Sequence, residues 1–377
     1  MSKLRPVLRR SRGPLLVFCA SVAIGAAFRY GEPVETSYPN PHTFTAYTLQ
    51  SREPVSATSS ILTLRAPDGS FGRESLQARI KDAVWSVQIR QPQLQVARSY
   101  TPLPTASTAN GSNEVNLTTC STPEVPIAKA ELDKNADAQF IRLLLRHYPS
   151  GELSHYLHML PLCSPVDVRG PFVEFYLPQE VDSVIFLAAG TGISPALQVA
   201  DMLRRRQVEG KTRSNVRILW ANRRREDCAG GVSDSILQTP GRRGWWPWSR
   251  RNCGQGAGVE QRETRNGSPR GTIVAELEAL KTGWNRGGDE GALLVDYFVD
   301  EEGSYITPSV VRQCLNASTK CTTERSQGKK LLLVSGPEGF IAYWAGRKLW
   351  AHGGEQQGPI EGVLSELNIN EWQVWKL

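Results

Sequence analysis

Residues Phe186 to Leu197, FLAAGTGISPAL, join an apolar run typical of a buried strand to a helical pattern. The run ends at Gly190-Thr191-Gly192, where two glycines let the backbone turn tightly and let a ligand approach it closely. Ser194 suits a helix N-cap and Pro195 suits the first helical position, so the free N–H groups of the helix would face a pyrophosphate. The alternative is a plain turn between strand and helix that binds no ligand. A P-loop is excluded, because no GK[ST] motif follows the glycines.

The pattern around this turn repeats along the second half of the chain. Strands are expected at 183–189, 215–222, 292–299 and 330–336, and helices at 194–206, 272–281, 307–315 and 338–350. Alternation of this kind predicts an α/β doubly wound parallel sheet, which we assign to residues 181–377. An insertion rich in Gly and Arg, residues 223–270, interrupts it.

The first half of the chain has a different pattern. Residues 42–100 carry short apolar alternations separated by turn residues, which predict β-strands. We therefore expect an N-terminal antiparallel β domain at residues 40–178. A polar stretch rich in Ser, Thr, Asn and Pro, residues 104–137, is expected to be a loop insertion within it.

The net charge of +7 is unevenly placed along the 377 residues. Residues 1–31 hold six Lys or Arg and no acid, and residues 223–270 hold ten Arg against five acids. The positive net charge therefore comes from the leader and the insertion, and we expect no nucleic-acid partner. Seven cysteines show neither a CxxC pair nor Cys/His metal spacing, so we expect unpaired thiols and no metal, although Cys314 and Cys321 could pair.

The leader, residues 1–31, has a basic front followed by an apolar run from Leu15 to Phe28. A secretory signal, a mitochondrial presequence and a short membrane anchor all fit this arrangement. Five Lys or Arg in the first 12 residues favour mitochondrial targeting combined with an anchor.

Two stretches in the first half suggest a second anionic pocket. Arg98 and Tyr100 are two apart on an expected strand, so they share a face that could hold a phosphate and a flat ring. Gly151 to Ser154 form a turn that opens a short helix, with free N–H groups for a phosphate. Asn222 at the end of the 215–222 strand is followed by Arg223, Arg224 and Arg225, which could meet a 2′-phosphate or simply be a solvated edge.

The order of these motifs resembles the ferredoxin–NADP reductase superfamily, and within it the cytochrome b5 reductases. The motifs are R-x-Y-T-P-L from Arg98, Y-P-x-G-x-x-S from Tyr148, RGP from Arg169, GTGISP from Gly190 and the Gly-Pro pair after Ser335. The leader and the C-terminal sequence are similar to fungal mitochondrial flavoproteins that support haem attachment to cytochrome c. The resemblance implies an FAD-binding β-barrel followed by an NAD(P)-binding domain.

Residue by residue, the resemblance implies that Arg98 contacts the flavin pyrophosphate, Tyr100 packs on the flavin, and Thr101 hydrogen-bonds near flavin N5. Thr101 and Ser335 are the expected catalytic residues, and no metal is expected. The expected cofactor-binding residues are Arg98, Ser99, Tyr100, Thr101, His147, Tyr148, Gly151, Glu152, Leu153, Ser154, Gly190, Thr191, Gly192, Pro195, Gly336 and Pro337.

The sequence departs from the family at three of these positions. Ser335 stands where the family usually has Cys, which predicts slower hydride transfer. Ser99 stands where Pro is usual, and Glu152 where Lys is frequent, so one cationic contact to FAD is missing.

The implied function is an FAD-dependent NAD(P)H oxidoreductase. Its acceptor would be haem or a haem protein (cytochrome c or its haem-attachment enzyme), and it would sit at the mitochondrial inner membrane with its body in the intermembrane space. Two alternatives stay open: a cytochrome b5 reductase-like NADH enzyme for a b-type cytochrome, and a low-turnover flavoprotein assembly factor that binds a haem-transfer enzyme.

Overall fold

The computed structural model describes residues 41–67, 80–104, 140–210, 213–234, 269–285, 291–321, 328–351 and 354–377. The chain divides into a unit Met1–Ser37 and a unit Tyr38–Leu377, and the description below concerns the second. The predicted leader lies outside the described residues, as do residues 105–137 of the first predicted insertion and 235–268 of the second.

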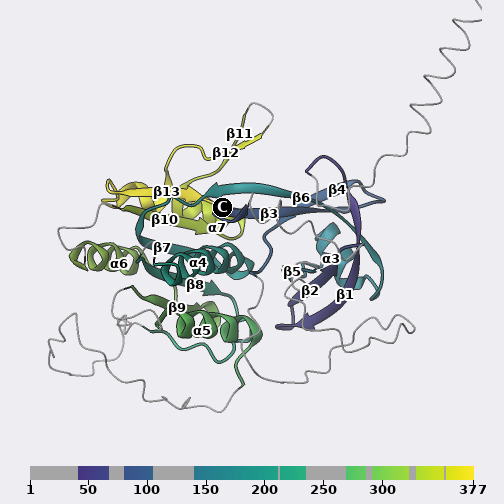
Figure 1. Cartoon of the computed structure of the whole chain (residues 1–377), viewed down its shortest axis with the longest axis horizontal. Helices are drawn as coiled ribbons and strands as arrows, with labels where there is room; N and C mark the ends of the chain where they lie inside the picture. The colour runs from purple at the N-terminus through teal and green to yellow at the C-terminus, as the bar shows by residue number, and fades with distance from the viewer. Residues whose placement is uncertain are drawn as a thin grey trace, which may run out of the picture. The chain divides into compact units, whose positions relative to one another are not determined.

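The first half of the unit forms a six-stranded antiparallel sheet in the order β4-β3-β6-β1-β2-β5 (Figure 1). The strands are β1 Thr45–Pro54, β2 Ser59–Arg65, β3 Ala83–Gln91, β4 Val96–Tyr100, β5 Phe140–Arg146 and β6 Pro165–Tyr176. Just past β4, Pro102 forms a bridge with Leu143 of β5, and the Leu103 N–H donates to the Arg142 carbonyl at 2.8 Å. The two edges of the sheet therefore meet, and the predicted antiparallel β-barrel is confirmed.

The barrel encloses its own apolar core. Inward-facing side chains such as Tyr47, Leu62 and Ile89 are almost fully buried, because alternate residues of a strand face the same side of the sheet. A short helix, α3 (Glu152–Met159), covers one end and buries Leu153 and Leu157 in this core.

The second half forms a five-stranded parallel sheet in the order β13-β10-β7-β8-β9. The strands are β7 Val181–Ala189, β8 Asn215–Asn222, β9 Leu293–Val299, β10 Lys329–Ser335 and β13 Trp372–Lys376. The runs 184–189 in β7 and 331–334 in β10 are apolar and buried, as expected of strands covered on both faces.

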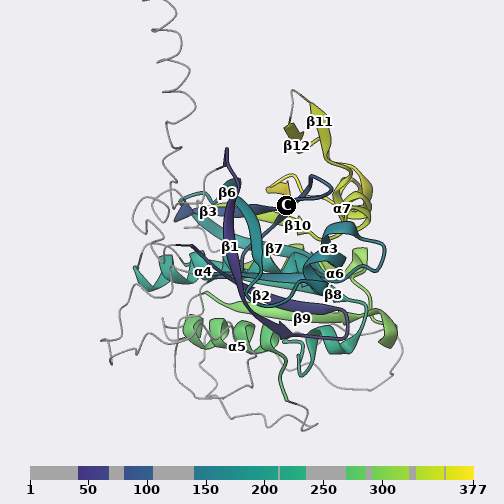
Figure 2. The ribbon, with the colours of Figure 1, turned by 90° about the vertical axis from the view of Figure 1, so that its right-hand side faces the viewer.

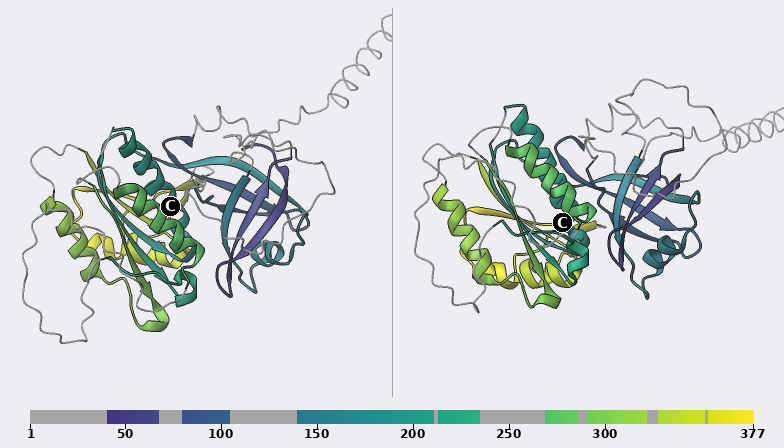
Figure 3. Two further views of the ribbon diagram at one scale, coloured as in Figure 1. Left: turned by 60° about the horizontal axis from the view of Figure 1, so that its bottom comes forward. Right: turned by 90° about the horizontal axis from the view of Figure 1, so that it is seen from below.

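Helices cover both faces of this sheet (Figure 3). The helices are α4 Ile193–Val208, α5 Thr272–Asn285, α6 Pro308–Cys321 and α7 Glu338–Ala345. Helices α4 and α5 pack on one face with Phe186 and Ile218, and α6 and α7 pack on the other with Ile185 and Leu219. The predicted doubly wound sheet is thus confirmed. Short 3₁₀ turns complete the elements: η2 Gly190–Gly192, η3 Arg225–Cys228, η4 Asp300–Glu302 and η5 Gly362–Glu366.

One predicted helix, 338–350, is too long. Helix α7 ends at Ala345, because Gly346 has a positive φ of 82° that ends the helix. The chain then forms a hairpin of β11 (Leu349–Ala351) and β12 (Gly354–Gln356), which projects from the body in Figures 1 and 2.

Cysteine pairing differs from the expectation at one residue. Cys163 is disulfide-bonded, whereas Cys228 and Cys314 are buried free thiols. The pairing of Cys314 with Cys321 that the spacing allowed is therefore absent. No helix among the described ranges is both long and apolar enough to cross a membrane.

Candidate functional site

The order in which the chain adds strands to the parallel sheet reverses between β7 and β10. The chain runs from β7 to β8 on one side, while β10 pairs with β7 on the other, so a crevice opens at the carboxyl ends of β7 and β10. Gly192 and Ser335 meet there: a Cβ on Gly192 would lie 2.6 Å from the Ser335 carbonyl carbon. Gly336, with φ of 152°, lies equally close to Ala189, since its Cβ would be 2.8 Å from that of Ala189. Only glycine fits at either position, and Pro337 follows as the N-cap residue of α7.

Helix α4 starts differently from the prediction. It begins at Ile193, after the 3₁₀ turn Gly190–Gly192, and Gly192 is its N-cap. Ser194 is therefore inside the helix, almost fully buried, and its Oγ has no hydrogen-bond partner among the described residues, so the expectation that it caps the helix is wrong. The tight turn at Gly190 (φ 53°) starts the helix two residues earlier. Pro195 remains in the first turn, where its missing N–H costs nothing.

Strand β4 brings two predicted residues together on one face. Arg98 is exposed, and its side chain donates only to the neighbouring Ala97 carbonyl, at 3.0 Å, within the described part of the chain. Burial raises the pKa of Tyr100 to about 12, Arg98 opposes this rise, and Tyr148 adds to it. Arg98, Tyr100 and Tyr148 are thus electrostatic neighbours. Ser99 lies on the opposite face of β4, in register with Gln88.

The turn before α3 is closed by hydrogen bonds around Ser154. The Tyr148 N–H donates to Ser154 Oγ at 3.2 Å, and that hydroxyl lies 3.2 Å from the Gly151 carbonyl. A Cβ on Gly151 would lie 2.5 Å from Ser154 Oγ, so a larger residue there would displace the Ser154 hydroxyl from this turn. Leu153 anchors the helix in the barrel core, and Glu152 is exposed in the first turn. The first N–H groups of α3 therefore remain available to a ligand.

Three histidines cluster beside this turn. His147 Nε2 lies 3.1 Å from His155 Nδ1, and the rings of His147 and His158 stack with centroids 4.3 Å apart. Burial is the largest cause that lowers the pKa of His158. The nearby His147, Arg52 and His155 lower this pKa further. Within the described ranges, no group of three or more His, Cys, Asp and Glu side chains is placed to hold a metal ion.

Gln198, which the sequence did not single out, ties α4 to the barrel. Its Oε1 accepts the Trp85 N–H at 3.0 Å, and its Nε2 donates to the Pro102 carbonyl at 2.8 Å. Thr101 immediately precedes Pro102, so this side chain fixes the strand end that carries Thr101. The available signal was a polar residue within the buried stretch from Ile193 to Ala200.

The three arginines after β8 have different surroundings. Arg225 pairs with Glu302, and Arg224 pairs with Glu226 at 3.3 Å. Arg223 is exposed, and no side-chain partner lies near it in the part of the chain that the structure describes. Of the three, Arg223 is the one left to meet a 2′-phosphate.

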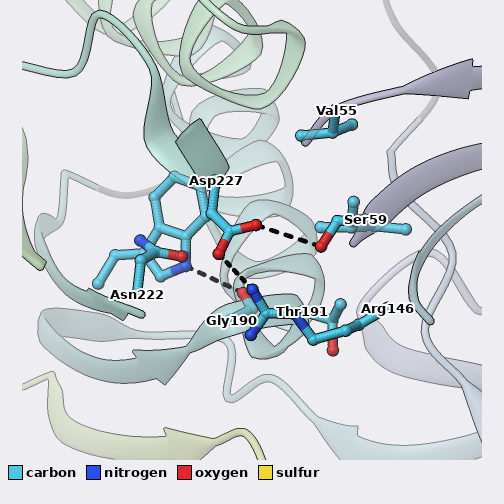
Figure 4. A pocket seen from close by; sticks show the side chains of 9 residues that line it. Val55, Ser59, Arg146, Gly190, Thr191, Asn222 and Asp227 are labelled. Atoms are coloured by element: carbon cyan, nitrogen blue, oxygen red, sulfur yellow. Dashed lines mark hydrogen bonds and ion pairs between the residues drawn. The ribbon is translucent and has the colours of Figure 1, made fainter. Parts of the chain in front are cut away.

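A small pocket opens between the barrel and the parallel sheet (Figure 4). The barrel contributes Val55, Ser59, Leu144 and Arg146, and the α/β part contributes Gly190, Thr191, Trp220, Asn222 and Asp227. Arg146 forms a largely buried ion pair with Asp227. Asp227 also accepts from Ser56 Oγ at 2.6 Å and from Ser59 Oγ at 3.3 Å. Trp220 Nε1 donates to the Gly190 carbonyl at 2.9 Å, which holds the glycine turn against β8.

We compared the sequence of this chain with those of known proteins. No family model matches the chain. It is 30% identical over 143 residues to NADH-cytochrome b5 reductase 1 of Pyricularia oryzae, a match that covers 38% of this chain and 46% of that protein. The chain is therefore similar in sequence to an NADH-cytochrome b5 reductase. The predicted resemblance is therefore confirmed.

Two further relatives are informative. The cytochrome c mitochondrial import factor CYC2 of Saccharomyces cerevisiae is 33% identical over 95 residues, covering 25% of this chain and 22% of that protein. An uncharacterized FAD-binding protein of Schizosaccharomyces pombe is 24% identical over 192 residues, covering 50% of this chain and 59% of that protein. The chain thus matches less than two thirds of the length of each of these three relatives.

Proposed function

We propose that this chain is an FAD-dependent NAD(P)H oxidoreductase that delivers electrons to haem or to a haem protein. The observation that carries the proposal is the contact between Gly192 and Ser335 at the switch point of the parallel sheet. Open α/β sheets bind nucleotides at this kind of crevice. A relative named for FAD binding and another named an NADH-cytochrome b5 reductase support the choice of cofactors.

The residues of the barrel fit an FAD. Arg98 has a guanidinium without an ionic partner among the described residues, which suits a pyrophosphate. No side chain of the described residues caps the start of α3, which lies beside His147 and Tyr148 of the preceding segment. Tyr100 offers a ring face beside Arg98, and Thr101 follows it at the strand end.

The residues of the parallel sheet fit a pyridine nucleotide. The turn Gly190–Gly192 leads directly into α4, and the positive dipole end of that helix favours a phosphate. Gly336 and Pro337 lie across the crevice, beside the buried Ser335. A bound FAD would supply the acceptance of a hydride from NAD(P)H and the release of its two electrons one at a time. The residues named above would orient the two ring systems toward each other.

For the acceptor we propose haem or the haem-attachment machinery of cytochrome c at the mitochondrial inner membrane, with the body facing the intermembrane space. The mitochondrial import factor among the relatives and the basic, acid-free leader support this assignment. The disulfide at Cys163 fits an oxidising compartment.

The test is spectroscopic. The purified full chain is expected to carry the visible absorbance of oxidised flavin, and anaerobic addition of NADH or NADPH is expected to bleach it. Absence of flavin from protein refolded or purified with excess FAD would refute the cofactor assignment. Free haemin and a b-type cytochrome are then compared as acceptors, and faster reduction of the b-type cytochrome would favour a cytochrome b5 reductase-like enzyme.

A second candidate is a low-turnover flavoprotein assembly factor that binds a haem-transfer enzyme. Ser335, in place of the cysteine usual in the family, favours it, because a hydroxyl is less polarisable than a thiol beside the hydride. Flavin that is bound but bleached by neither NADH nor NADPH in stopped-flow mixing would support this candidate over the oxidoreductase.

A further inference from the structure

The hairpin of β11 and β12 carries large apolar side chains into solvent. Trp350 is 78% exposed, more than any other large apolar side chain in the described ranges, and its neighbour Leu349 is 50% exposed. Among the described strands these two pair only with each other, and the hairpin projects from the body (Figures 1 and 2). Exposed apolar residues that gather on one element mark an interaction site. The hairpin is therefore a candidate for such a site.

A buried lysine fixes the hairpin to the parallel sheet. Lys376, in β13, is 2% exposed, and its Nζ donates to the carbonyl of Arg347 before β11 at 3.0 Å and to that of Pro359 after β12 at 2.8 Å. The Gln357 side chain donates to the Lys376 carbonyl at 2.9 Å and accepts from its N–H at 2.8 Å. A two-stranded hairpin is marginally stable by itself, so these bonds make it a fixed projection of the α/β part.

We call the described residues 347–351 and 354–357 the arm. Its two large apolar side chains lie on opposite faces of the hairpin, because successive residues of a strand alternate between its faces. Both Leu349 and Trp350 are exposed, so no described element covers either face. A protein partner with a flat surface would cover one face only, whereas a lipid interface surrounds an inserted hairpin on both sides. Tryptophan is also enriched at the interface between membrane and water.

Basic residues immediately precede the apolar pair of the arm. Arg347 is exposed and has no side-chain partner in the part of the chain that the structure describes. Lys348 pairs with Glu355 at 3.0 Å and balances its charge, so the arm keeps the positive charge of Arg347. An extended chain advances about 3.3 Å per residue, which places Trp350 up to about 10 Å beyond Arg347. Interfacial segments insert by about 5–10 Å, so Trp350 can reach the acyl boundary while Arg347 stays with the phosphates.

We propose that the arm binds an anionic lipid bilayer, with Leu349 and Trp350 at the acyl boundary and Arg347 at the headgroup phosphates. This site is separate from the proposed flavin and nucleotide sites, and from any contact that residues 1–31 make with a membrane. Lys376, at the base of the arm, lies in register with Val334 of β10. Lipid binding through the arm therefore holds the carboxyl edge of the parallel sheet near the bilayer surface.

The first test uses the full-length, flavin-loaded chain with fluorotryptophan in place of tryptophan. Trp350→Phe identifies the fluorine NMR signal of Trp350 among those of the other tryptophans. The wild type is then mixed with small bicelles of phosphatidylcholine and cardiolipin, with or without a spin label in the acyl chains. The spin label is expected to broaden the signal of Trp350. This measurement reports on the arm itself, whether or not the leader also binds lipid.

The second test compares the affinity of variants for vesicles by cosedimentation. Trp350→Ser is expected to weaken binding to vesicles that contain cardiolipin by on the order of 10-fold, since one large apolar side chain no longer enters the interface. Arg347→Gln is expected to weaken binding to the same vesicles by about fivefold, and to have no effect on pure phosphatidylcholine. The matched control is Tyr176→Ser, which removes a 68% exposed aromatic side chain outside the arm and should leave binding unchanged. All three side chains are exposed, so the thermal midpoint should stay that of the wild type.

A Trp350 signal that the spin-labelled lipid leaves unchanged would overturn the inference, and this result decides where the leader holds every variant on vesicles. Slower reduction of a haem protein by Trp350→Ser, with wild-type vesicle affinity, would also overturn it and assign the arm to a protein partner. NADH is expected to bleach the flavin equally in all variants. Failure of the wild type to bleach would refute the proposed function and leave the lipid test intact.

Discussion

Gly192, in the turn after β7, packs against Ser335 at the end of β10 so closely that no Cβ fits between them. The two residues are far apart in sequence and lie on neighbouring parallel strands. Their contact brings the glycine turn, the start of α4 and the Ser335-Gly336 peptide to one point at the carboxyl edge of the sheet. Backbone atoms crowd this point, so glycine is required at both Gly192 and Gly336.

Gly192→Ala is expected to destabilise the fold by about 1–3 kcal/mol, because the added methyl overlaps the Ser335 backbone and the strand ends must separate. Binding of NAD⁺ should weaken in parallel. Gly339→Ala in α7 is the control, since nothing lies within 4 Å of its Cβ and Ala favours a helix. Urea unfolding measures both variants. Equal stability of the two would show that the contact tolerates a side chain.

Ser335→Cys is expected to accelerate flavin reduction by NADH several-fold without changing nucleotide affinity. Ser335 is 5% exposed, so a thiol of similar shape fits the same space while presenting a more polarisable atom to the nicotinamide. Stopped-flow reduction at saturating NADH measures the rate. Ser335→Ala is the control for the loss of the hydroxyl alone. A rate in Ser335→Cys equal to that in Ser335→Ala would exclude a role for the thiol.

The elements of this fold were predictable where the signal is local. The apolar run before Gly190, the helical pattern after it and the alternations in residues 42–100 each report the periodicity of one element. Two local errors occurred where the backbone conformation outweighed the side-chain pattern. The 3₁₀ turn at Gly190–Gly192 starts α4 before Ser194, and Gly346 ends α7 five residues before residue 350.

The contacts that assemble the site were not predictable, because they join residues far apart in the chain. Gln198 reaches Pro102, 96 residues away, and Arg146 reaches Asp227, 81 residues away. In sequence, Arg146 is one basic residue beside His147, and Asp227 is one acid after three arginines. Nothing in their periodicity shows that they form a buried pair across two sheets.

The histidine cluster predicts a pH dependence of stability. The pKa of His158 is lowered in the folded chain, so the unfolded chain binds a proton first as the pH falls. The stability gained from neutral His158 is therefore present above about pH 6.5 and decreases below it. His158→Gln is expected to reduce the difference in urea midpoint between about pH 7.5 and about pH 5.5. An unchanged difference in His158→Gln would disprove the assignment.

Gln198→Met is expected to cost about 2–4 kcal/mol of unfolding free energy, because it leaves the Trp85 N–H and the Pro102 carbonyl without their partner in a buried position. Met202→Leu, a volume-conserving change in the same helix, is the control and should cost less than about 1.5 kcal/mol. The loss should extend beyond stability. Pro102 follows Thr101, so a freed strand end lets Thr101 move relative to α4, and FAD should dissociate faster from Gln198→Met than from Met202→Leu. Equal FAD dissociation rates, with the stability loss present, would limit Gln198 to a packing role between barrel and helix.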